Sequence, residues 1–365
     1  MASLFSACKS AVRNNSGGTF NIGGYDIDLE LYRQSDINTD VQYGDVAFGD
    51  DDESKIVVVA DNTITIPEGY TLTPDHPKKS LVLFCNNLVN NGTISMYQKA
   101  PNVLPHNFFI LDSNIAGTAR DIVIPAYANN GNINTSAGTN GTNRNCGSGG
   151  WGDHSNHGSG NHERGSYGVP GTAYAFGGGA GAGGILTRVY TEAKGIQCIP
   201  DSTYPMRGGA SYYDDSTGGA ASGGAGNPQG TTIYKGYGTT PEAVIGCGGR
   251  VIIFCINFTN NGLINVNGST QNTYDMGNAR FANGGASGGG AIDLFYTTLL
   301  EQGTITANGG GGPYSYNKGG DGSITLSQWS QTKLFKTEVK YFSQANVAYL
   351  LTQLSDRIKD SRMGE

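Results

Sequence analysis

The chain contains the segment Leu81-Val-Leu-Phe-Cys-Asn-Asn-Leu-Val-Asn-Asn-Gly92-Thr-Ile-Ser-Met96, and its pattern recurs further along the sequence. An apolar run leads into a polar Asn-Asn-Gly turn, and the turn leads into a short alternating stretch. Asn and Gly tolerate the left-handed backbone of a tight turn. Alternation at period 2 is typical of a half-buried strand. The segment therefore predicts a strand, a turn and a second strand.

Three further segments align with this one on Gly131, Gly262 and Gly303. Around each of the four glycines, fixed positions carry apolar residues: nine before, four before and two after. These residues are Leu83, Ile122, Ile253 and Leu294; Leu88, Tyr127, Phe258 and Leu299; and Ile94, Ile133, Ile264 and Ile305. The repeat has a period of about 40 residues, within the range of stacked repeat proteins. A large insertion separates the second copy from the third, and partial copies are expected at 56–66 and from Gly322.

The composition agrees with a repetitive strand architecture. Of 365 residues 58 are Gly, which disfavours helix interiors, while 37% hydrophobic residues argue against a disordered chain. One repeat cannot bury its apolar face alone, whereas stacked neighbours bury a continuous column of Leu, Ile, Phe and Cys. We therefore expect an all-β fold: an elongated β-solenoid, or β-helix-like stack of repeats, with a glycine-rich insertion and a C-terminal α-helix. A β-sandwich built from the same hairpins is the alternative.

The pattern divides the chain into an N-terminal region, two blocks of repeats, an insertion and a C-terminal region. The expected boundaries are 1–54, 55–137 for the first β repeats, 138–247 for the glycine- and tyrosine-rich insertion, 248–328 for the later β repeats, and 329–365. In the last region, apolar residues at helical spacing predict an amphipathic helix. They are Val347, Leu350, Leu351, Leu354 and Ile358. This helix would either cap one end of the stack or mediate oligomerisation.

The insertion interleaves glycine runs, such as 177–184, with aromatic residues. Flexible linkers seldom carry so many tyrosines, and a mixture of Tyr, Gly, Ser and Asn is typical of recognition surfaces. We therefore favour a compact region of closely packed chains over a linker. The candidate recognition residues are Trp151, Tyr212, Tyr213, Tyr234 and Tyr237. Each of them could instead pack between glycine-rich chains.

Three of the five histidines, His154, His157 and His162, fall in one glycine-rich stretch of the insertion. Imidazole and carboxylate groups are ligands for zinc, nickel or iron. The spacing matches no strong zinc signature. A metal ion at this histidine-rich loop and a plain polar loop therefore both remain open, and no other cofactor is implied.

Several classes of function are disfavoured. A net charge of −7 without a basic cluster is unsuited to binding nucleic acid. The sequence contains no apolar run of about 18 residues, so membrane insertion is not expected. The acidic run 50–53 is interpreted as a solvated turn, and the six cysteines, without CxxC spacing, as buried free thiols. Glycoside hydrolysis needs two carboxylates that flank a substrate, for which Asp214, Asp215 and Glu242 are candidates. Because no catalytic motif is present, we expect no enzyme.

The repeat at Leu88–Met96 and the later segments Gly289–Phe295 and Gly303–Gly310 resemble glycine-rich tail-fibre and receptor-binding proteins of bacteriophages and phage-tail-like particles. The resemblance covers approximately 56–326. It implies a virion tail or baseplate protein that is made in the host cytoplasm and needs no signal peptide. It also implies a homotrimer that contacts other tail proteins through 1–54. Through the insertion, this trimer would bind a host cell-surface polysaccharide or surface protein with many weak contacts.

Three other functions remain open at this point. One is a tailspike-like enzyme that degrades glycans, the second is a secreted bacterial surface adhesin, and the third is a purely structural baseplate protein.

Overall fold

The computed structural model describes residues 3–37, 45–46, 48–103, 107–115, 121–123, 154–156, 162–163, 185–187, 212–213, 220–221, 224–230, 232–234, 237–239, 246–270, 281–311 and 318–335. The chain divides into two compact units, Met1–Leu334 and Phe335–Glu365. Apart from Phe335, the described residues all belong to the first unit.

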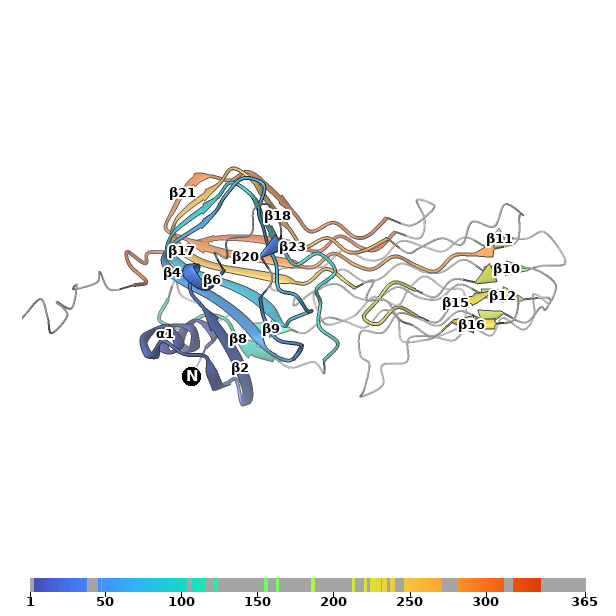
Figure 1. The fold of residues 1–365 in the computed structure, drawn as a ribbon, viewed down its shortest axis with the longest axis horizontal. Helices are drawn as coiled ribbons and strands as arrows, with labels where there is room; N and C mark the ends of the chain where they lie inside the picture. The colour runs from blue at the N-terminus through green and yellow to red at the C-terminus, as the bar shows by residue number, and fades with distance from the viewer. Residues whose placement is uncertain are drawn as a thin grey trace, which may run out of the picture. The chain divides into compact units, whose positions relative to one another are not determined.

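The largest sheet has the strand order β1-β2-β4-β6-β17-β20-β23, and β21 pairs with β17 beside this path (Figure 1). Its strands are β1 (Gly18–Ile22), β2 (Tyr25–Tyr32), β4 (Ile56–Ile66), β6 (Ser80–Asn90), β17 (Arg250–Asn260), β20 (Ala291–Tyr296), β21 (Thr298–Glu301) and β23 (Ser323–Gln328). Only the pairing of β1 with β2 is antiparallel, and every other pairing in this sheet is parallel.

A second sheet has the order β22-β18-β7-β5-β3 and is parallel throughout. Its strands are β3 (Asp45–Val46), β5 (Thr71–Leu72), β7 (Thr93–Ser95), β18 (Leu263–Asn265) and β22 (Thr304–Thr306). Each of β7, β18 and β22 follows a strand of the largest sheet in the sequence, so the repeats contribute to both sheets.

The repeat alignment reappears as strand register in three of the four copies. Leu83 pairs with Ile253, which pairs with Leu294 on its other side. In the second sheet, Ile264 likewise lies between Ile94 and Ile305. The two partial copies join the same stack, because β4 pairs with β6 and β23 pairs with β20.

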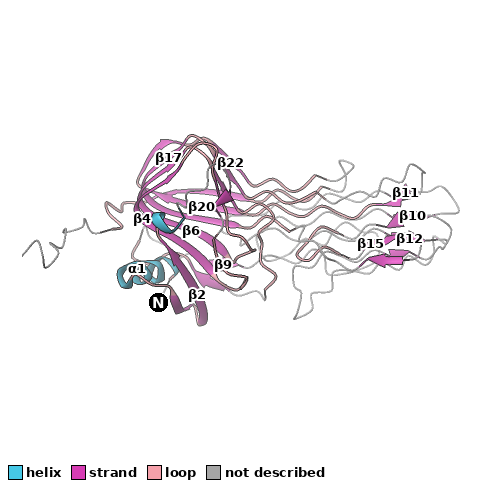
Figure 2. Ribbon diagram, in the orientation of Figure 1, coloured by secondary structure: helices cyan, strands magenta, loops and turns pink. Residues whose placement is uncertain are grey.

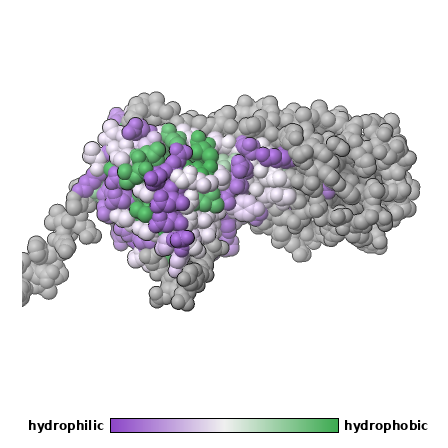
Figure 3. Space-filling model, turned by 90° about the horizontal axis from the view of Figure 1, so that it is seen from above, coloured by the Kyte–Doolittle hydropathy of each residue, from purple (hydrophilic) through white to green (hydrophobic). Residues whose placement is uncertain are grey.

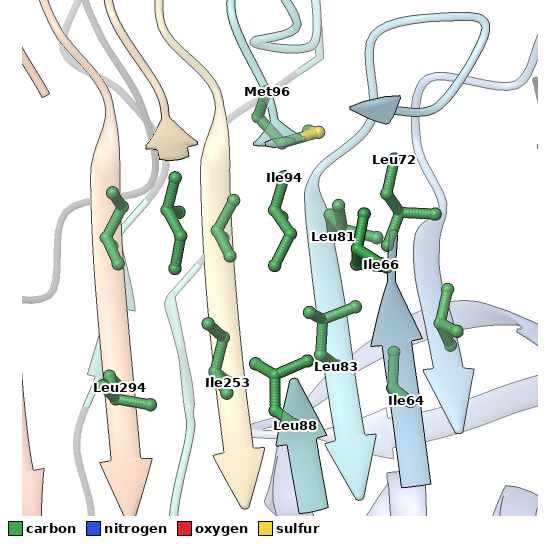
Figure 4. Close-up of a cluster of buried hydrophobic side chains, with 14 of the residues drawn as sticks. Ile64, Ile66, Leu72, Leu81, Leu83, Leu88, Ile94, Met96, Ile253 and Leu294 are labelled. Carbon is green, nitrogen blue, oxygen red and sulfur yellow. The ribbon is translucent and has the colours of Figure 1, made fainter. Parts of the chain in front are cut away.

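The core lies between these two sheets and consists of the repeated apolar positions. Figure 4 shows Leu83, Ile253 and Leu294 from neighbouring strands of the largest sheet together with Ile94 of the second sheet. All four side chains are fully buried. Close packing of this kind supplies most of the free energy that holds such strands together.

The Asn-Asn-Gly motif forms the bend between the two sheets rather than a hairpin turn. Of the three bend glycines Gly92, Gly262 and Gly303, only Gly303 has a positive φ, at 58°. At Gly262 the reason for glycine is close approach, since a Cβ there would lie 1.9 Å from the Gly92 carbonyl oxygen. The next amide, Leu263 N, donates to that oxygen at 2.9 Å. The backbones of successive bends therefore pack directly against each other.

The other face of the largest sheet is partly covered by helix α1 (Leu4–Asn14), which Figure 2 shows beside β2. Ser3 caps the helix, and the Ser3 and Ser6 side chains form a reciprocal capping box. Phe5 reaches the sheet, where its ring centroid lies 5.2 Å from that of Phe254 and 5.5 Å from that of Trp329. The only other helix among the described residues is the short α2 (Gln34–Ile37).

The predicted fold class is therefore wrong. In place of an all-β, elongated β-solenoid, the described residues form a mixed α/β arrangement with a mostly parallel sheet and two helices. In a solenoid each coil follows the previous one along the chain, whereas here β6 lies directly against β17 and residues 91–249 separate them in sequence. The alternative, a β-sandwich of hairpins, is also wrong because the copies pair in parallel.

The second predicted copy departs from the stack where it is described. Its strand β9 (Asp121–Val123) pairs antiparallel with β8 (Asn107–Phe109), so Ile122 lies opposite Phe108 instead of a repeat residue. The rest of this copy, with Tyr127, Gly131 and Ile133, lies outside the described residues, and so does the predicted helix of the C-terminal region.

Candidate functional site

Four of the five predicted recognition residues lie on short strands. Tyr212 and Tyr213 form β13 (Tyr212–Tyr213), at one end of a four-stranded sheet with the order β11-β10-β12-β13. The other strands of this sheet are β10 (His154–Asn156), β11 (His162–Glu163) and β12 (Ile185–Thr187). Trp151 lies outside the described residues.

Tyr234 and Tyr237 are direct partners in a second small sheet. They end β15 (Thr232–Tyr234) and begin β16 (Tyr237–Thr239), which pair antiparallel. The sheet has the order β16-β15-β14-β19 and includes β14 (Ala220–Ala221) and β19 (Phe281–Ala282). A tyrosine pair at the end of a hairpin places two aromatic residues at one position of the sheet.

The two small sheets are neighbours in space. Strand β13 of the first sheet lies close to β14 and β15 of the second, and Figure 1 shows the labels of the two sheets gathered in one region. The four tyrosines, spread over 26 residues of sequence, therefore come from adjacent short strands. We call the three strands that carry Tyr212, Tyr213, Tyr234 and Tyr237, namely β13, β15 and β16, the tyrosine strands.

The predicted metal residues are only partly brought together. Strands β10 and β11 pair so that His154 lies opposite Glu163 and His162 lies opposite Ser155, one position further along the ladder. His157 lies outside the described residues. Within the described part of the chain, no group of three or more His, Cys, Asp or Glu side chains is placed to hold a metal ion. A metal site here stays a prediction.

The acidic run holds a buried lysine that the sequence did not reveal. Lys78, whose side chain is fully buried, places its Nζ 2.7 Å from Glu30 Oε1, 2.7 Å from Asp50 Oδ1 and 3.0 Å from the Asp52 carbonyl oxygen. An ammonium group has three donors, and all three are used here. The solvated acidic turn expected for 50–53 is thus also an anchor, and Lys78 is occupied by structural contacts.

The electrostatics around Lys78 follow from these contacts. Hydrogen bonds from Lys55 and Lys78 hold the pKa of Asp50 well below its usual range. Burial, together with the hydrogen bond that its hydroxyl donates to Glu30 Oε2 at 2.9 Å, raises the pKa of Tyr32 to about 12. At neutral pH both groups therefore keep the charge state that the network requires.

Two further sets of buried side chains, an ion pair and the cysteines, have no access to a ligand. Arg250 and Asp293 form an ion pair in which both side chains are fully buried, and burial raises the pKa of Asp293 despite the neighbouring guanidinium. The cysteines Cys8, Cys85 and Cys255 are buried free thiols, as predicted, and Cys247 is also buried. Burial raises the thiol pKa of Cys8, Cys85 and Cys255, which makes them poor nucleophiles.

A few large apolar side chains are exposed in the described part of the chain: Tyr25, Tyr97, Leu299, Leu300 and Ile324. Figure 3 shows hydrophobic residues gathered among hydrophilic ones on one face. Leu299 and Leu300 lie on β21, whose four residues are all exposed. Ile324 lies on β23, the last strand of the largest sheet. Strands β21 and β23 therefore carry exposed apolar residues.

Comparison with family models, with curated proteins and with solved structures finds no significant match for this chain. No described helix combines the length and the apolar character that a membrane span requires.

Proposed function

We propose that this protein is a receptor-binding protein of a phage tail fibre or baseplate, or of a phage-tail-like particle, and that it attaches the particle to the host cell surface. The observation that carries the proposal is the gathering of the tyrosine strands in the insertion. Tyrosines on short strands offer rigid, amphipathic contact area at low entropic cost, which suits recognition of a surface ligand.

The longer segment 100–247, which contains the insertion, leaves and rejoins the stack at one fixed base. Ala100 N donates to the Cys247 carbonyl oxygen at 3.1 Å, and Gly249 N donates to the Met96 carbonyl oxygen at 2.8 Å. Between Ala100 and Cys247, the described strands belong to other, smaller sheets. Binding residues carried on loops work best when a rigid scaffold positions them. The stacked repeats are suited to be that scaffold.

The ligand is proposed to be a host polysaccharide or surface protein, bound by several copies at once. A homotrimer would convert individually weak contacts into strong attachment. The exposed residues Leu299, Leu300 and Ile324 support a contact between copies, or with another tail protein, along the edge formed by β21 and β23. A particle assembled in the host cytoplasm is consistent with the reduced, buried cysteines.

Retention on isolated bacterial cell walls tests this proposal. The labelled full-length protein is sedimented with a panel of Gram-positive and Gram-negative walls, and the wall that retains it defines the receptor source. The double variant Tyr234→Ala/Tyr237→Ala is expected to bind that wall at least about tenfold more weakly, as expected for a lost aromatic hot spot.

The matched control is Tyr25→Ala, which removes an exposed tyrosine from the N-terminal hairpin β1–β2. It should bind like the parent protein. If no wall retains the parent, or if the double variant binds as tightly as the control, the proposal is wrong. Release of sugars from the wall by the parent protein would instead support the glycan-degrading alternative.

A further inference from the structure

A cleft of about 360 Å³ opens beside the second sheet, and its lining residues do not belong to the tyrosine strands. Its walls are the two segments that follow the neighbouring strands β5 and β7. The polar and aromatic residues that line it include Asp75, His76, Ser95, Tyr97, Gln98 and Lys99. Pockets of 300–1,000 Å³ are the usual size of small-molecule sites, so this cleft suits a small ligand.

The two walls are fixed to each other. Lys99 Nζ donates to the Asp75 carbonyl oxygen at 2.5 Å and so ties one wall to the other. On the second wall, Tyr97 N donates to Ser95 Oγ at 3.1 Å, and Lys99 N donates to the Met96 carbonyl oxygen at 3.2 Å. The cleft is thus formed by ordered turns, and a ligand would find it largely pre-formed.

Gln98 has an unusual backbone conformation at this position. Its φ is +60°, and only one other non-glycine residue with a positive φ is described, the helix-capping Asn15. The chain that returns from the insertion presses against it, because a Cβ on Gly246 would lie 2.1 Å from the Gln98 carbonyl oxygen. Strained residues that the surrounding structure holds in place are concentrated at ligand sites. Gln98, the strained residue, is also one of the residues that line the cleft.

The chemistry of the lining selects a class of ligand. Tyr97 is 40% exposed and offers an aromatic face, while Asp75, His76 and Gln98 offer hydrogen-bond acceptors and donors. The charges of the Asp75 carboxylate and the Lys99 ammonium group balance each other in the lining. This balance disfavours phosphate or another anion as the ligand. Asp75 and His76 are too few ligands for a metal ion, and no such group is found among the described residues.

We propose that this cleft binds a neutral saccharide of one or two sugar units, with the apolar face of one ring on Tyr97 and its hydroxyls on Asp75 and Gln98. The site lies on the stacked repeats, so it does not depend on the proposed role of the tyrosine strands. It would give each chain a second, independent contact to a polysaccharide.

Saturation-transfer NMR with the full-length protein tests the proposal, using glucose, galactose, N-acetylglucosamine and their disaccharides as probes. At least one of these sugars is expected to give a transfer signal, and the variants Tyr97→Ala and Asp75→Asn are expected to weaken its binding about tenfold. The matched control Tyr25→Ala removes a tyrosine that is 42% exposed, close to the 40% of Tyr97. It should leave binding unchanged.

The double variant Tyr234→Ala/Tyr237→Ala separates this site from the proposed receptor site. It should keep the sugar signal while its binding to cell walls weakens at least about tenfold, so the two proposals can fail independently. The saccharide site is wrong if none of the neutral sugars binds, if Tyr97→Ala binds like the parent with an unchanged circular dichroism spectrum, or if phosphate or a uronic acid displaces the sugar and binds more tightly.

Discussion

At the residue scale, the bend glycines are required because neighbouring copies of the repeat approach each other closely. A methyl group on Gly262 would meet the Gly92 carbonyl oxygen at 1.9 Å. That oxygen also accepts the hydrogen bond from Leu263 N, so it cannot move away freely. The spacing of these glycines was visible in the sequence. The physical reason for glycine at these positions was not visible in the sequence, because a left-handed turn and a close approach of backbones both select glycine.

We expect Gly262→Ala to lower the free energy of unfolding by about 1–3 kcal/mol, the usual cost of overpacking. Gly311→Ala is the matched control, since the nearest atom to a Cβ there is Thr270 Oγ1 at 3.6 Å. Differential scanning calorimetry measures both. Equal melting temperatures for the two variants would contradict the stacking of the bends.

Lys78 is a buried charged group whose loss should destabilise the fold. Lys78→Met leaves Glu30 without its closest cation and removes the anchor of the Asp50–Asp52 turn. Breaking a buried ion pair by removing one partner costs about 3–5 kcal/mol, and we expect the lower part of this range because Asp50 is 44% exposed. Lys318→Met, which breaks the exposed pair with Asp321, is the control and should cost less than about 0.5 kcal/mol.

The same network makes stability depend on pH. Because Lys55 and Lys78 lower the pKa of Asp50 in the folded protein, this group stabilises the fold above its unfolded pKa of about 4. The contribution is lost as the pH falls from there towards the folded pKa. The melting temperature of Asp50→Asn should therefore fall less than that of the parent between pH 5 and pH 3. A parallel decline of the two curves would show that Asp50 is not held by the lysines.

At the element scale, rows of asparagine amides tie the strands of the stack together. Asn90 Nδ2 donates to Asn260 Oδ1 at 2.7 Å, and Asn260 Nδ2 donates to the Gln302 carbonyl oxygen at 2.6 Å, with both asparagines fully buried. The neighbouring row, in which Asn261 Nδ2 donates to Asn91 Oδ1 at 2.8 Å, is exposed. Such ladders fix the register of parallel strands.

We expect Asn260→Ala to lower the free energy of unfolding by about 1–3 kcal/mol, because it leaves buried polar groups without partners. Asn261→Ala removes the same side chain one position further along, where water can replace it, and should change stability by less than about 0.5 kcal/mol. Thermal unfolding followed by circular dichroism gives both values. A larger effect at Asn261 than at Asn260 would refute the role of the buried row.

The sequence allowed the register of the repeats to be predicted, because an apolar residue recurs at each fixed distance from the glycine. Thus Leu83, Ile253 and Leu294 lie side by side. The same pattern misplaced Ile122, which pairs with Phe108, because a short apolar match cannot distinguish parallel stacking from a local antiparallel pair. Helix α1 was missed although its signals are present: the Ser3 cap and the apolar residues Phe5 and Cys8 one turn apart.

At the scale of the whole molecule, the chain combines a scaffold of stacked strands with an insertion that departs from one base. The neighbouring tyrosine strands could be predicted only as a composition, because pairing between residues such as Ile185 and Tyr212 is not encoded in either segment alone. The same holds for the Lys78 network and the cleft beside the second sheet, which bring together residues from separate segments. Contacts between distant segments depend on the fold, and here the fold class itself was predicted wrongly.

The most direct measurement of the proposed function is competition for adsorption. Bacteria whose walls retain the protein are saturated with the purified protein and then mixed with particles that carry this chain in their tail, as the proposal requires, and unadsorbed particles are counted. We predict that the parent protein and Tyr25→Ala block adsorption, whereas Tyr234→Ala/Tyr237→Ala at the same concentration does not. Undiminished adsorption in the presence of saturating parent protein would contradict the account.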